Sequence, residues 1–150
     1  MSKFIYRMQN ILNIKYKLED QAKTEFMLAN QILREEEEKL QKLKDRKAGY
    51  EEEVRRLLQK NLQVDLIKEN QEAIVRMGEF IKEQTERVKE AQYQVDQKAA
   101  KLTELRKERK AQEKLKEKAF ENFLQEENAR ESKEIDELVS FTYGRRQREE

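Results

Sequence analysis

Apolar residues recur along the first half of the chain at the spacing of a coiled-coil seam. Steps of three, four or seven residues separate them, and charged residues fill the positions between. The series comprises Phe4, Met8, Ile11, Leu18, Ala22, Phe26, Ala29, Leu33, Leu40, Leu43, Tyr50, Val54 and Leu57. Two successive steps of four, from Leu18 through Ala22 to Phe26, shift the heptad by one residue. Such a shift unwinds a supercoil locally without ending the helix, so we expect one helical arm over about residues 3–62.

The second half carries a more regular heptad. Its seam positions are Ile74, Met77, Ile81, Val88, Ala91, Val95, Leu102 and Leu105. Between Arg106 and Lys118 only Ala111 and Leu115 are apolar, and the seam thickens again at Ala119, Phe120, Phe123, Leu124, Ile135, Leu138 and Val139. Gly144 is a natural helix stop. We therefore expect a second arm over about 72–142 and a frayed C-terminal tail at 144–150.

A break between the arms is expected near the middle of the chain. Asn61, Asp65 and Asn70 cluster there, and such side chains favour turns because they compete for backbone hydrogen bonds. A turn within about 60–73 folds the arms into an antiparallel coiled-coil hairpin. The prediction is an all-α chain forming a single domain over 1–150, with Phe4 near Leu138.

The composition supports long helices and argues against catalysis. Charged residues make up 43% of the chain and apolar ones 36%, with no Pro and three Gly, which is typical of coiled coils, although disorder is the competing reading. The absence of His and Cys excludes Ser-His triads, thiol nucleophiles and His or Cys zinc sites. Carboxylates on two bare helices face water rather than a pocket. We expect no enzyme, cofactor, metal or small-molecule ligand.

The expected location is the cytosol. The N-terminus lacks the apolar core of a signal peptide, and no stretch approaches the roughly 18 apolar residues of a membrane span. Residues 1–18 form a basic amphipathic segment that suits an anionic membrane surface. The alternative is that its apolar stripe meets the second arm, which the continuous seam spacing favours.

Two charge blocks lie side by side in the second arm. Residues 101–118 hold eight basic and four acidic residues, and residues 121–137 hold seven acidic and two basic ones. Acids usually favour the N-terminal end of a helix and bases its C-terminal end, so local helix energetics do not explain this order. The basic block is either a solvated face with ion pairs four residues apart or a docking strip for an acidic protein. RNA binding is less favoured, because no aromatic residue lies among the basic ones.

Short segments at both ends of the chain carry a resemblance to a known family. They are Phe4 and residues 8–12 at the N-terminal end, and residues 106–111, 113–118, 126–127, 130–131, Lys133 and 135–137 at the C-terminal end. These segments resemble the flagellar type III export protein FliJ family. The 150-residue length agrees as well. Gln112 departs from the family pattern, which more often has an apolar residue there, and this puts seam packing at that turn in doubt.

The resemblance implies a coiled-coil stalk similar to that of rotary ATPases. It implies a non-enzymatic adaptor that binds the hexameric export ATPase, promotes its ring assembly and activity, and links it to the membrane export gate and export chaperones. It implies a site at the cytoplasmic face of the membrane at the flagellar base, serving flagellum biogenesis and motility. The ATPase-facing candidates are Arg106, Lys107, Arg109 and Lys110, and the gate candidates are Leu43, Tyr50 and Phe80.

Two other functions stay open at this point. A structural filament or tether unrelated to export would assemble with rising concentration. A nucleic-acid-binding rod would use residues 101–118 and would lose affinity steeply with salt.

Overall fold

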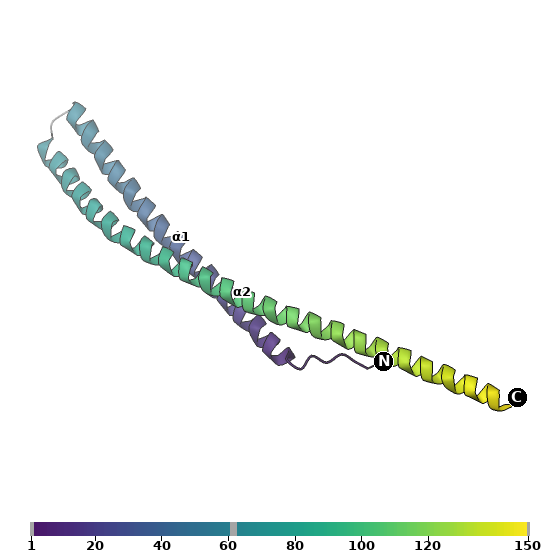
Figure 1. The fold of residues 1–150 in the computed structure, drawn as a ribbon. Coiled ribbons are helices and arrows are strands. Elements are labelled where there is room, and N and C mark those ends of the chain that lie inside the picture. The colour runs from purple at the N-terminus through teal and green to yellow at the C-terminus, as the bar shows by residue number, and fades with distance from the viewer. Residues whose placement is uncertain (1, 61–62, 150) are drawn as a thin grey trace. The chain divides into compact units, whose positions relative to one another are not determined.

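The chain folds into two long helices that pack against each other as a hairpin (Figure 1). The computed structural model describes residues 2–60 and 63–149. Helix α1 spans Gln9–Lys60 and helix α2 spans Val64–Glu149, and no strand occurs among the described residues. The predicted all-α hairpin of two long helices is confirmed. Over the described residues, neither helix is long and apolar enough to cross a membrane.

The chain divides into two compact units, each built from a stretch of both helices. The hairpin unit is Asp20–Glu104, and the terminal unit comprises residues up to Glu19 together with those from Leu105 onward. In each unit the α1 stretch lies along the α2 stretch, so the seam within each unit can be read separately.

The hairpin unit has a narrow apolar core. Ala29 and Leu33 of α1 pack with Ala91 and Val95 of α2, and all four side chains are buried. The partly buried side chains of Phe26 and Val88 pack against this cluster. These positions follow the predicted heptad in both arms, because one apolar stripe per helix is enough to cover its partner.

Both helices begin at residues that differ from those expected. Helix α1 begins at Gln9 rather than near residue 3, after a turn in which the Gln9 amide donates to the Tyr6 carbonyl at 3.2 Å. Helix α2 begins at Val64 rather than near 72. The predicted turn falls between Lys60 and Val64, where Asn61 and Leu62 lie outside the described residues.

Local chemistry explains why the polar residues after Val64 do not break α2. Asp65 lies in the first turn, where a carboxylate is favoured by the helix dipole. The Asn70 side-chain amide donates to the Leu66 carbonyl at 2.9 Å, so it bonds within the helix instead of competing with it. Helix α2 also continues through Gly144 to Glu149, because this glycine keeps a negative φ.

Phe4 contacts Phe120 and Phe123 rather than the predicted Leu138. The ring centroids of Phe4 and Phe120 are 5.2 Å apart, and those of Phe4 and Phe123 are 5.4 Å apart. The expected register assumed a turn centred later in the chain. With α2 beginning at Val64, each α1 residue meets an α2 residue of lower number than expected.

Candidate partner-binding surface

The buried positions of α1 in the terminal unit are not the predicted apolar ones. Leu12 is 1% exposed and Glu19 is 5% exposed, whereas Ile11 and Leu18 are 38% and 37% exposed. Ile11 and Leu18 are therefore wrong as seam positions. The side chains that face α2 lie one residue further along, and one of them is a carboxylate.

This shift removes the interruption expected in the α1 heptad. Steps of three and four run from Leu12 through Lys15 and Glu19 to Ala22 without a break, and Lys15 is half-buried. The apparent double step of four arose because the apolar Leu18 was assigned to the seam in place of Glu19. From Leu12 to Ala22 the heptad is continuous, with polar residues at two of its positions.

Helix α2 shows the same substitution of polar for apolar seam residues. Ala111 and Leu115 are exposed, and the half-buried positions are Arg109, Gln112, Glu113 and Lys116. The heptad therefore continues through the basic block, with polar residues at its seam positions. Gln112, the departure from the family pattern, occupies the seam, and its side-chain oxygen is buried without a hydrogen-bond partner in the described part of the chain.

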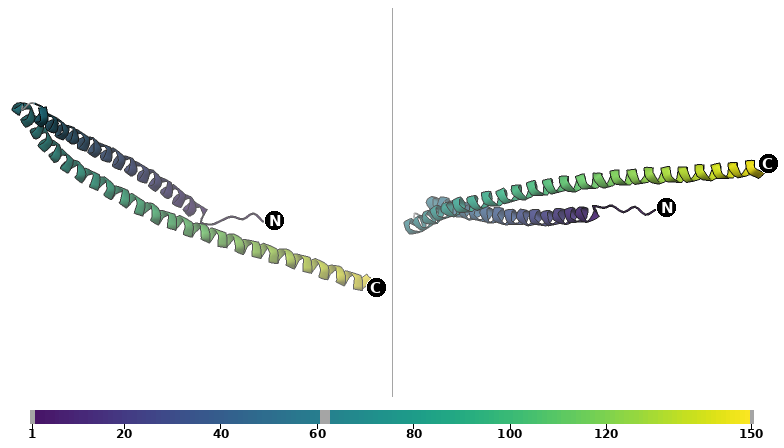
Figure 2. Two further views of the ribbon diagram at one scale, coloured as in Figure 1. Left: turned by 90° about the horizontal axis from the view of Figure 1, so that it is seen from above. Right: turned by 60° about the horizontal axis from the view of Figure 1, so that its bottom comes forward.

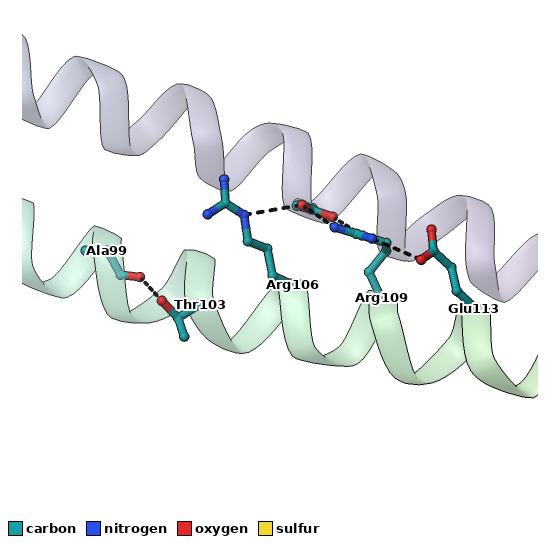
Figure 3. Close-up of polar contacts among 6 residues, drawn as sticks. Ala99, Thr103, Arg106, Arg109 and Glu113 are labelled. Atoms are coloured by element: carbon teal, nitrogen blue, oxygen red, sulfur yellow. Dashed lines mark hydrogen bonds and ion pairs between the residues drawn. The ribbon is translucent and has the colours of Figure 1, made fainter.

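An ionic layer of Glu19, Arg106, Arg109 and Glu113 spans this seam (Figure 3). Arg109 makes a bidentate contact with Glu19, with Nε at 2.6 Å from one carboxylate oxygen and Nη2 at 3.2 Å from the other. Its Nη1 also donates to Glu113 at 3.0 Å. The hydrogen bonds to Glu19 raise the pKa of Arg109 above its ordinary value, so this guanidinium stays charged.

Two further contacts flank the ionic layer. Lys15 Nζ lies 3.0 Å from a carboxylate oxygen of Glu108. The Tyr16 hydroxyl donates to Glu113, and this hydrogen bond raises the pKa of Tyr16 and lowers the pKa of Glu113. These polar contacts join the α1 and α2 stretches of the terminal unit.

The layer divides the four predicted ATPase-facing residues into two kinds. The Arg109 side chain is only 20% exposed and forms an ion pair with Glu19. Arg106 is 46% exposed and lies 3.5 Å from Glu19 through its Nε. Lys107 and Lys110 are exposed on α2. The arginines hold the seam, and the lysines present charge to solvent.

An aromatic cluster adjoins the ionic layer on the same unit. Phe4, from the non-helical N-terminal segment, packs edge-on against Phe120 and at a tilt against Phe123. The Tyr6 hydroxyl is buried without a hydrogen-bond partner among the described residues. Glu19 and Tyr6 were both missed by sequence reasoning, although the unbroken heptad through Lys15 was a signal for Glu19.

The three predicted gate residues all lie in the hairpin unit but differ in exposure. Leu43 and Tyr50 lie seven residues apart on α1 and are both half-buried, while Phe80 on α2 is 47% exposed. Phe80 is thus the gate candidate whose ring is most accessible to a partner.

An apolar groove lies elsewhere on the hairpin unit. Leu28, Ala29 and Ile32 of α1 line it together with Ala91 of α2. At one end Gln84 donates to the Glu36 backbone carbonyl at 3.0 Å and to the Glu36 carboxylate, and this contact lowers the pKa of Glu36.

Comparison with known proteins identifies the family. The family described as "Flagellar FliJ protein" matches residues 3–148. This chain belongs to the FliJ family. It is a helical protein associated with flagellar type III export. No curated protein matches it.

A solved structure agrees with the fold of this FliJ-family chain. A structure described as that of a YscO homologue from Chlamydia trachomatis is 23% identical, with a TM-score of 0.58, and the match covers 99% of this chain and 100% of that one. At that level of identity the likeness supports the helical hairpin alone.

Proposed function

We propose that this FliJ-family chain is a non-enzymatic stalk and adaptor of the flagellar export apparatus. It binds the hexameric export ATPase, promotes ring assembly and ATP turnover, and links the ring to the membrane export gate and to export chaperones. The family match over residues 3–148 carries the proposal. The exposed lysines of the terminal unit supply a surface that the ATPase can bind.

The ATPase-facing surface in this proposal is centred on Lys107 and Lys110. These side chains are three residues apart on α2 and are both exposed, so they project from the same face of the helix. The neighbouring Arg109 is held by Glu19, which fixes the other side of α2 against the α1 stretch. A pair of exposed cations suits an acidic patch on a partner and orients it on approach.

The hairpin unit supplies the gate contact in this proposal. Phe80 offers an exposed ring, and large aromatic side chains are the commonest anchors in protein interfaces. Leu43 and Tyr50 are half-buried and support the same unit from α1. The protein then acts in the cytoplasm, beside the membrane at the flagellar base.

The experiment that tests this function is the ATP turnover of the cognate export ATPase with increasing amounts of the purified chain. We expect saturable stimulation at a fixed stoichiometry, because the stalk acts by binding the ring. A chain carrying Lys107→Glu and Lys110→Glu should stimulate weakly. A chain carrying Lys68→Glu and Lys82→Glu, which reverses two exposed lysines of the hairpin unit, has the same net charge and should stimulate as strongly as the natural chain. An ATPase that forms rings and is unaffected by the chain would contradict the proposal.

A further inference from the structure

The last part of α2 carries an apolar stripe that nothing in the described chain covers. Every residue from Glu131 to Tyr143 is exposed, and Ile135, Leu138 and Val139 are 60%, 68% and 61% exposed. Among the described residues of the N-terminal segment, Ser2 accepts a hydrogen bond from Arg130 at 3.4 Å, ahead of the stripe. In Figures 1 and 2 this end of α2 runs on beyond the N-terminal segment of the same unit.

The stripe has the geometry of a helix–helix seam. Ile135, Leu138, Val139 and Thr142 are spaced by three, one and three residues, which places them on one face of the helix. The Thr142 hydroxyl is satisfied by the Leu138 carbonyl at 2.9 Å, so its hydroxyl does not require water. Residues 139–144 are mostly β-branched or aromatic residues and glycine, which are weak helix formers. A helix of this composition is stabilised when its apolar face is covered.

The charges on either side of the stripe complement each other across an antiparallel pair of these helices. If Leu138 of one copy lies opposite Val139 of another, Ile135 lies opposite Thr142 and Glu131 lies opposite Arg146. This charge match occurs twice, once at each end of the pair. A parallel pair would instead place each of the two charges against its own copy, which is repulsive.

Glu131 and Arg146 are also available for such a contact. Neither forms an ion pair with another described residue, whereas the adjacent Arg145 lies 3.5 Å from Glu149 within its own helix. The complementarity therefore uses charges that the described fold leaves unused.

We propose that two copies of this chain associate through residues 131–146 of α2 as a closed antiparallel dimer. The interface is isologous, because the same stripe serves both copies. It extends over about 24 Å of helix, which is short for a permanent interface. We expect a reversible dimer with a Kd of order micromolar. The inference is independent of ATPase binding and concerns the state of the chain when this end is not otherwise occupied.

Charge reversal tests the pairing on the full chain by sedimentation velocity over a range of concentrations. Glu131→Arg or Arg146→Glu alone should weaken the dimer by roughly tenfold, because two attractive pairs become repulsive. The two changes together restore the match and should recover the original Kd. Arg148→Glu changes the net charge equally but lies outside the paired positions, and it should leave the dimer unchanged. Circular dichroism of each variant checks that the helices are retained.

Engineered cysteines test the direction, since the natural chain has none. A chain with both Glu131→Cys and Arg146→Cys should form an intermolecular disulfide under mild oxidation. Arg146→Cys alone should not, because the two copies of residue 146 are about 22 Å apart in the antiparallel pair. A parallel dimer would give the opposite result for the single variant and overturn the proposal.

Three other results would also overturn the dimer. They are a monomer at every concentration up to several hundred micromolar, a dimer that the paired reversal does not recover, and open-ended growth beyond two copies. None of these results depends on whether the chain stimulates an ATPase, so the proposed function can stand or fall separately.

Discussion

The two units of this hairpin use the same heptad with different side chains. The hairpin unit closes its seam with Ala29, Leu33, Ala91 and Val95. The terminal unit continues the spacing with an ionic layer between Glu19 and Arg109. Apolar packing supplies stability with little directional preference, whereas a bidentate ion pair requires its partners in one geometry.

The two seams differ in what they contribute to the stability and to the register of the paired helices. Buried ion pairs contribute little net stability, because desolvation offsets much of the attraction, but they can fix the register of paired helices. We therefore assign most of the stability to the hairpin unit and the alignment of α1 with α2 near the exposed lysines to the ionic layer. The predictions below test this division.

The largest expected effect is on stability, from truncating the apolar core of the hairpin unit. Leu33 is 8% exposed, and Leu33→Ala should lower the free energy of unfolding by about 2–4 kcal/mol through lost burial and a residual cavity. Urea denaturation followed by circular dichroism measures the change. Leu58 is 55% exposed, and Leu58→Ala should stay within about 0.5 kcal/mol of the natural chain. Equal losses at the two positions would contradict the assignment of stability to this core.

A smaller loss is expected from breaking the ionic layer. Glu19→Leu leaves Arg109 without its main partner, but that side chain is 20% exposed and can still reach water. The double change Glu19→Leu with Arg109→Leu should recover stability, since an apolar pair replaces a desolvated charged one. Urea denaturation of the single and double variants provides the comparison. If the double variant is less stable than the single one, the ionic layer stabilises the fold in addition to fixing the register of the helices.

Much of the seam is readable from the sequence, and the exceptions have one cause. From Ala22 to Leu57 and from Ile74 to Leu105 the heptad positions are mostly apolar, so periodicity locates them. In the terminal unit the spacing of apolar residues favoured Ile11 and Leu18 as seam positions, whereas Leu12 and Glu19 occupy them. The positions of Glu19 and Arg109 depend on a contact between residues 90 apart in the chain, which periodicity alone does not reveal.

The division of the predicted basic strip was beyond sequence reasoning for the same reason. Arg106, Lys107, Arg109 and Lys110 are alike in charge, and only the position of Glu19 on α1 separates the seam arginines from the exposed lysines. The resemblance to the FliJ family indicated the region. The register of the two helices then decided which residues in it face solvent.

The pH dependence of unfolding should differ between the units. Hydrogen bonds lower the pKa of Glu113 in the terminal unit and of Glu25 and Glu36 in the hairpin unit below 4.5. Their contributions are complete above that ordinary value and are lost as pH falls through the lowered pKa values. Tyr16 has a raised pKa, so its contribution is complete below pH 10.0 and is lost as pH rises through the raised value.

An alkaline loss that involves Tyr16 is therefore expected in the terminal unit. Thermal unfolding measured from pH 7 to 11 should show it, and Tyr16→Phe should reduce it. An alkaline loss that is unchanged in Tyr16→Phe would contradict a role for the Tyr16–Glu113 hydrogen bond.

The smallest expected effects come from two glycines inside the helices of the hairpin unit. A Cβ added at Gly49 or Gly78 meets nothing within 4 Å, so alanine adds helix propensity without a clash. Gly49→Ala and Gly78→Ala should each raise the free energy of unfolding by about 0.5–1 kcal/mol. Thermal unfolding measures the gain. A loss of stability in either variant would show that the glycine makes a close contact in solution.

The most direct test of the account is the stimulation of the cognate export ATPase by two variants of this chain. Lys107→Glu with Lys110→Glu reverses the exposed charges, and Glu19→Leu with Arg109→Leu replaces the buried pair. We predict that the lysine variant loses most of its stimulation while keeping its helicity, and that the leucine variant retains it. Full stimulation by a folded lysine variant would contradict the account.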